Sequence, residues 1–192
     1  MRQFTENFYL NEHLWPGHLG HFFIILGFVT AIFTFAIGIR HFLSDQKSED
    51  SLKQTKIFFS IHFLSVLGIV FLLIFLFKGQ YFEYHYIWRH SSSDLPWYYI
   101  LSAMWEGQEG SFILWIFWHA VLGALLLRNV TKNRVGALAI LMFIQALLFT
   151  MILGVDVFGK LIGTNPFILL RNELNIPLLK YPNFLFLIND GI

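Results

Sequence analysis

The sequence predicts an all-α integral membrane protein with four transmembrane helices. Of its 192 residues, 56% are hydrophobic and only 13% are charged, and the mean hydropathy is +0.61, which suits lipid better than water. A helix needs roughly 20 mainly apolar residues to cross about 30 Å of hydrocarbon, because its backbone polar groups must bond internally. The stretches that qualify are about residues 19–42, 57–77, 112–127 and 135–154.

The composition also excludes several classes of function. The formal net charge is +1, and no basic tract alternates with aromatic residues, so we expect no nucleic-acid partner. The chain has no cysteine and therefore offers no disulfide, thiolate metal site or thiol exchange. Any redox chemistry would need a bound cofactor or a partner protein.

The positive charges predict the orientation of the spans. Basic residues crowd the short connections after the first and third spans. These are Lys47, Lys53 and Lys56, and then Arg128, Lys132 and Arg134. Because basic connections are retained in the cytoplasm, we expect both termini, the loop 78–111 and the tail 155–192 on the outer, periplasmic side.

Small side chains line one face of the first span. Gly27, Ala31, Thr34 and Gly38 recur three or four residues apart, so another helix backbone can approach closely there. Aromatic residues instead gather near the predicted outer boundary, where an interfacial belt would account for many of them. They are Trp15, Tyr81, Tyr84, Tyr86, Trp88, Trp97, Tyr98, Tyr99 and Trp105.

The loop 78–111 has its own structural signal. Asp94 or Ser93 can cap a helix that has Pro96 near its first turn. Apolar residues then recur at helical spacing, which predicts an amphipathic helix on the membrane surface between the second and third spans. These residues are Trp97, Tyr98, Leu101, Met104 and Trp105.

A tight turn follows, from Trp105 to Ser111, in which Gly107 and Gly110 interrupt the helix. We expect Glu109 or Ser111 to cap the third span. The turn has two interpretations, a structural connection or a surface that faces a ligand. Glu106 and Glu109 could act as an acid–base pair, but the glycine between them leaves their separation unfixed.

Several histidines fall within or beside the predicted spans, among them His21, His62 and His119. An ionisable group at membrane depth suggests function, although bonding to a neighbouring backbone or hydroxyl group is the alternative. Haem suits such a chain, because imidazole ligates its iron and aromatic rings pack on its macrocycle. A second set, Glu83, His85, His90 and Asp94, fits no recognised metal site, so we predict none.

Several stretches together resemble a known family. They are Leu95-Pro-Trp-Tyr-Tyr99, Ser102-Ala-Met-Trp105, Gly107-Gln-Glu-Gly-Ser111 and Leu114-Trp115, with Gly17-His-Leu-Gly20 before them and Asn165-Pro-Phe167 after. This pattern resembles the CcmF and CcsA group, the haem lyase membrane proteins of bacterial cytochrome c maturation, in a version similar to that of Bacteroidetes.

The resemblance implies a multi-pass protein of the bacterial cytoplasmic membrane that handles haem and presents it to apocytochrome c on the outer face. Its implied partners are haem, apocytochrome c and other cytochrome c maturation membrane proteins. It implies no catalytic residue in this chain, but a haem- or apocytochrome-facing surface. That surface comprises Trp97, Trp105, Glu106, Gln108, Glu109, Trp115 and His119.

The chain also departs from the family pattern. The tryptophan-rich haem-binding segment and the His-Pro-Pro motif of the family are absent from these 192 residues. We therefore expect residues 1–192 to be one membrane module, the amino-terminal part of a longer protein, with the axial haem ligands elsewhere. Such a part should not act alone as a holocytochrome c synthase.

Two other functions remain open from the sequence. One is a non-catalytic structural or partner-binding membrane subunit with no haem contact. The other is a transporter, which ranks last because the spans lack paired intramembrane charges and broken helices.

Overall fold

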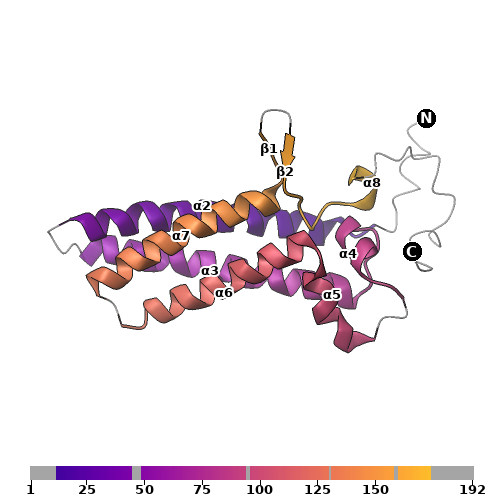
Figure 1. Ribbon diagram of the computed structural model, residues 1–192, viewed down its shortest axis with the longest axis horizontal. Helices are drawn as coiled ribbons and strands as arrows, with labels where there is room; N and C mark the ends of the chain where they lie inside the picture. The colour runs from indigo at the N-terminus through magenta and orange to yellow at the C-terminus, as the bar shows by residue number, and fades with distance from the viewer. Residues whose placement is uncertain (1–11, 45–48, 94–95, 130, 158–159, 174–192) are drawn as a thin grey trace.

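The computed structural model describes residues 12–44, 49–93, 96–129, 131–157 and 160–173. Within them, the four long helices α2 (Leu14–Leu43), α3 (Glu49–Lys78), α6 (Gln108–Leu126) and α7 (Lys132–Leu153) lie side by side along one axis (Figure 1). Each is long and apolar enough to cross a membrane. The four-span, helical fold class is thus confirmed.

The helices extend beyond the apolar stretches from which they were predicted. α2 begins at Leu14 rather than Leu19. α3 begins at Glu49, and the carboxylates of Glu49 and Asp50 interact favourably with the positive end of its helix dipole. Thr131 caps α7 by accepting a hydrogen bond from the Arg134 amide at 3.3 Å. α7 ends where Gly154 adopts a left-handed conformation at φ 67°.

The small face of α2 is buried against its neighbours, as predicted. A Cβ on Gly27 would lie 2.5 Å from Cζ of Phe149 on α7, and one on Gly38 would lie 3.2 Å from Cβ of Ala139. Ala31 and Thr34 are fully buried, and the Thr34 hydroxyl donates to the Thr30 carbonyl at 2.7 Å. Close backbone approach therefore joins α2 to α7 without leaving a buried hydroxyl unpaired.

Short elements gather at one end of the bundle (Figure 1). They are α4 (His85–His90), the 3₁₀ turn η1 (Trp97–Tyr99), α5 (Ile100–Glu106), the antiparallel strands β1 (Val155–Val157) and β2 (Lys160–Ile162), and α8 (Leu170–Glu173). The loop 78–111 and the first part of the tail therefore share this end. α2 and α6 end at the other end of the bundle, where α3 and α7 begin, so the basic residues near the starts of α3 and α7 lie there (Figure 1). Which end faces the cytoplasm stays a prediction.

The predicted surface helix takes a different form. Residues 97–106 fold as η1 followed by α5, and α4 precedes them. On α5, Ala103 and Met104 are buried in the protein, whereas Leu101 and Trp105 are exposed. Ser93 lies before η1 and Asp94 lies outside the described residues. That this segment rests on a membrane surface remains a prediction.

The Gly27 contact can be tested by adding one methyl group. We expect Gly27→Ala to lower the free energy of unfolding by about 1–3 kcal/mol, because Phe149 is fully buried and its ring cannot retreat. Thermal unfolding of the detergent-solubilised protein measures the change. Ala36→Leu, on the exposed face of the same helix, is the control, and an equal loss in both variants would contradict the close-packing account.

Candidate functional site

The site begins with the buried side chain of Tyr84, at the start of α4. Its hydroxyl donates to the His13 carbonyl at 2.5 Å and accepts from the Gly17 amide at 2.8 Å. Burial raises the pKa of Tyr84 to about 12, so the hydroxyl keeps its proton near neutral pH. This one group therefore fixes the beginning of α2 against the loop that follows α3.

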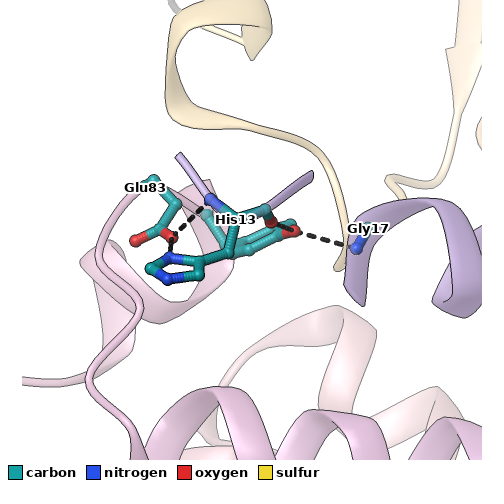
Figure 2. A network of polar contacts seen from close by, with 4 residues as sticks. His13, Gly17 and Glu83 are labelled. Carbon is teal, nitrogen blue, oxygen red and sulfur yellow. Dashed lines mark hydrogen bonds and ion pairs between the residues drawn. The ribbon is translucent and has the colours of Figure 1, made fainter. Parts of the chain in front are cut away.

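Two further sets of contacts surround Tyr84. Glu83, almost fully buried, accepts from the His13 amide at 3.3 Å and contacts His13 Nδ1 at 3.1 Å (Figure 2). The backbone pairs Leu170 N–H to Glu83 O at 2.7 Å, and His85 N–H to Ile168 O at 3.0 Å. The start of α2, residues 83–85 and residues 168–170 thus form one hydrogen-bonded unit.

Tyr86, two residues further on, makes an equivalent pair of hydrogen bonds to the turn region, residues 104–111. Its buried hydroxyl donates to the Met104 carbonyl at 2.8 Å and accepts from the Gly110 amide at 3.1 Å. Burial raises the pKa of Tyr86 as well. A Cβ on Gly110 would collide with the Met104 carbonyl oxygen and the Tyr86 hydroxyl, so only glycine lets this amide reach the tyrosine.

Gly107 ends α5 and also starts α6, with no side-chain cap on either helix. The prediction that Glu109 or Ser111 caps the third span is therefore wrong. The N-cap is Gly107, two residues before Glu109 and four before Ser111, so Glu109 falls in the first turn of the helix, near the positive end of its dipole. The Glu109 carboxylate instead accepts a hydrogen bond from the Thr164 hydroxyl, and the Ser111 hydroxyl donates to the Trp105 carbonyl at 3.0 Å.

The turn exposes part of the predicted ligand-facing surface. Trp105 is 38% exposed, and the side chains of Glu106 and Gln108 are exposed beside it. Glu109 differs, because it is half-buried and bonded to Thr164. Glu106 and Glu109 therefore have different surroundings and do not form a matched acid–base pair.

The remaining members of that surface are not gathered at the turn. Trp115 and His119 lie further along α6, His119 about 15 Å from Glu109 at 1.5 Å per residue. Trp115 is exposed on the side of the bundle. Trp97 is the first residue of η1, and its side chain lies outside what the structure describes. The predicted ligand-facing residues thus fall into two separate groups, one at the turn 105–109 and the other, Trp115 and His119, in the middle of α6.

The two outlying stretches of the family pattern pack against each other. A Cβ on Gly20 would overlap the Phe167 ring. The Asn165 side-chain oxygen accepts from the Phe167 amide at 2.9 Å, and its Nδ2 lies 2.7 Å from Nδ1 of His21. Residues almost 150 positions apart in sequence therefore build a single contact beside Tyr84.

His21, His62 and His119 have separate surroundings and do not form a haem-ligating pair. His62 Nδ1 donates to the Gly27 carbonyl at 2.9 Å, and its Nε2 is sealed within the bundle beside the Phe149 ring. The Nδ1 atom of His21 is hydrogen-bonded to Asn165 Nδ2. The Nδ1 atom of His119 is buried without a hydrogen-bond partner, and α6 contains no other histidine. Among the described residues, no group of three histidine or acidic side chains could hold a metal ion either.

Sequence reasoning missed the two residues that organise this site. Tyr84 and Tyr86 were assigned to an interfacial aromatic belt, yet the structure buries both side chains. The signal that could have found them is the presence of two nearby tyrosines together with two glycines of the family pattern, Gly17 and Gly110. Hydropathy alone cannot show that pairing, because the partners are distant in sequence.

The Gly110 contact predicts a second sensitive position. We expect Gly110→Ala to destabilise the protein by about 1–3 kcal/mol or more, because the added methyl group would meet backbone that cannot move aside. Denaturant unfolding in detergent, followed by tryptophan fluorescence, provides the measurement. Gln108→Ala, at an exposed position of the same turn, should change little, and equal stability of both variants would refute the proposed role of Gly110.

Comparison with known proteins gives two kinds of similarity. No protein-family model matches the chain. The cytochrome c-type biogenesis protein CcmF of Pseudomonas fluorescens is 44% identical over 43 residues, which is 22% of this chain and 6% of that protein. CcmF of Haemophilus influenzae is 47% identical over 49 residues, which is 26% of this chain and 8% of that protein.

The fold agrees over a longer stretch. The solved structure of the cytochrome c heme lyase CcmF matches 76% of this chain with a TM-score of 0.66 and 21% sequence identity, and the match covers 25% of that structure's chain. The chain thus spans only a small part of the length of its curated relatives. It resembles CcmF, in sequence over about a quarter of its residues and in fold over three-quarters of them.

Proposed function

We propose that this chain is the membrane module of a cytochrome c-type biogenesis protein that handles haem and presents it to apocytochrome c. The proposal is supported by the positions of three stretches of the sequence in the fold. The stretches that resemble the haem lyases, residues 17–20, 95–115 and 165–167, are distant in sequence. Gly20 packs against Phe167, and Glu109 accepts a hydrogen bond from Thr164, which precedes Asn165, so all three stretches contribute to one end of the bundle. Trp105 is exposed at this end of the bundle.

The surface suits a hand-over role rather than haem storage. His21, His62 and His119 provide no axial pair, so we infer that haem passes over this face as a substrate. Trp105 offers an aromatic plane, while the adjacent Glu106 and Gln108 offer polar contacts. The tyrosine–glycine contacts hold the backbone of this turn in a fixed position, which lowers the entropy cost of engaging a partner.

The same arrangement supports the predicted orientation of the bundle in the membrane. The basic residues Lys53, Lys56, Arg128 and Arg134 lie at the end of the bundle away from the turn. The positive-inside tendency then favours a cytoplasmic location for that end and an outer location for the turn. Cytochrome c assembly on the outer face of a bacterial cytoplasmic membrane, together with other maturation proteins, is consistent with this placement.

The experiment is a loss-of-function comparison in the full-length protein. We expect Trp105→Ala to lower the yield of covalent cytochrome c by about fivefold or more at equal membrane protein level, because exposed aromatic anchors contribute strongly to recognition. The yield is measured by haem staining of a co-expressed cytochrome c. Trp118→Ala is the matched control, since Trp118 is also exposed but lies mid-span on α6.

An unchanged yield in Trp105→Ala would contradict the proposal and favour a non-catalytic membrane subunit. An equal fall in both tryptophan variants would also contradict it, because the effect would then not belong to the turn.

A further inference from the structure

An open pocket of about 350 Å³ lies beside Tyr84, between the first turns of α2, the end of α7 and residues 165–172. Its volume is at the lower end of the range of about 300–1,000 Å³ for small-molecule sites. Apolar and polar groups share the lining, which consists of Leu14, Gly17, His18, His21, Tyr84, Leu153, Asn165, Phe167, Ile168, Leu169, Arg171 and Asn172. The turn from Trp105 to Ser111 does not contribute to this lining.

Hydrogen bonding fixes the tautomer of His21. The Asn165 side-chain oxygen accepts from the Phe167 amide at 2.9 Å, so the amide nitrogen of Asn165 faces His21. That nitrogen can only donate, and it lies 2.7 Å from His21 Nδ1. Nδ1 must therefore accept, and Nε2 carries the ring proton as a hydrogen-bond donor.

Other side chains of the lining also offer hydrogen-bond donors. His18 lies three residues before His21, on the same face of α2. The Arg171 guanidinium, 27% exposed, lines the pocket and contacts Glu12 at 3.4 Å. No carboxylate belongs to the lining among the described residues. An anionic oxygen in the pocket would meet these donors, while the charges of Arg171 and of the Glu12 carboxylate, which is outside the lining, offset each other in their ion pair.

We propose that this pocket binds the anionic head of an amphiphile, a carboxylate or phosphate group, with the Nε2–H of His21 as a donor to it. The apolar part of the ligand would lie along Leu14, Leu153 and Phe167, which share the pocket with these donors. Two molecules of a bacterial membrane carry this chemistry: haem, through its propionate carboxylates, and a phospholipid, through its phosphate. Only the haem alternative rests on the proposed function.

The test measures direct binding to the purified full-length protein in neutral detergent. Haem is compared with its dimethyl ester, in which the carboxylates are blocked, and phosphatidylglycerol is compared with diacylglycerol, which has no phosphate. We expect His21→Phe to weaken binding of haem, phosphatidylglycerol or both by about tenfold, and to leave binding of the two blocked analogues unchanged. His21→Gln, which keeps a donor and an acceptor, should recover most of the affinity.

His41→Phe, at the other end of α2, controls for replacing a histidine on this helix. A change for haem alone assigns the pocket to haem carboxylates, and a change for phosphatidylglycerol alone assigns it to lipid phosphate. Unchanged binding of both, or equal weakening by His41→Phe, would overturn the proposal. Because the readout is ligand binding and not cytochrome c yield, its failure is distinguishable from failure of the proposed function.

Discussion

Two tyrosine hydroxyls connect the segments at one end of the helix bundle. Tyr84 and Tyr86 are buried, and each hydroxyl donates to a backbone carbonyl while accepting from a glycine amide. Leaving any of these buried groups without a partner would cost about 1–3 kcal/mol, so each tyrosine strongly favours one arrangement of its neighbours. Tyr84 joins the start of α2 to the loop, and Tyr86 joins the loop to the turn before α6.

The glycines complete this arrangement. Gly17 and Gly110 donate to the two hydroxyls, and at both positions a Cβ would crowd the tyrosine. Gly20 makes room for the Phe167 ring in the same way. The family-like pattern is therefore mainly a pattern of close contacts. The framework leaves the side chains of Trp105, Glu106 and Gln108 exposed.

The sequence was sufficient to predict what depends on local composition. Hydropathy located all four spans, and the spacing of Gly27, Ala31, Thr34 and Gly38 located the close-packed face of α2. The cap of α6 and the burial of Tyr84 and Tyr86 were not predictable in this way. They depend on partners such as His13, Met104 and Thr164, which lie far away in sequence or across a turn whose geometry is set by packing.

The central claim is that Tyr84 couples the start of α2, residues 83–86 and the tail into one unit. Hydrogen exchange of the full-length protein, compared between wild type and Tyr84→Phe, tests it most directly, because exchange reports local opening. We predict faster exchange at residues 13–17 and also at residues 165–170, which have no direct bond to the Tyr84 hydroxyl. Faster exchange confined to residues 13–17 would contradict the claim.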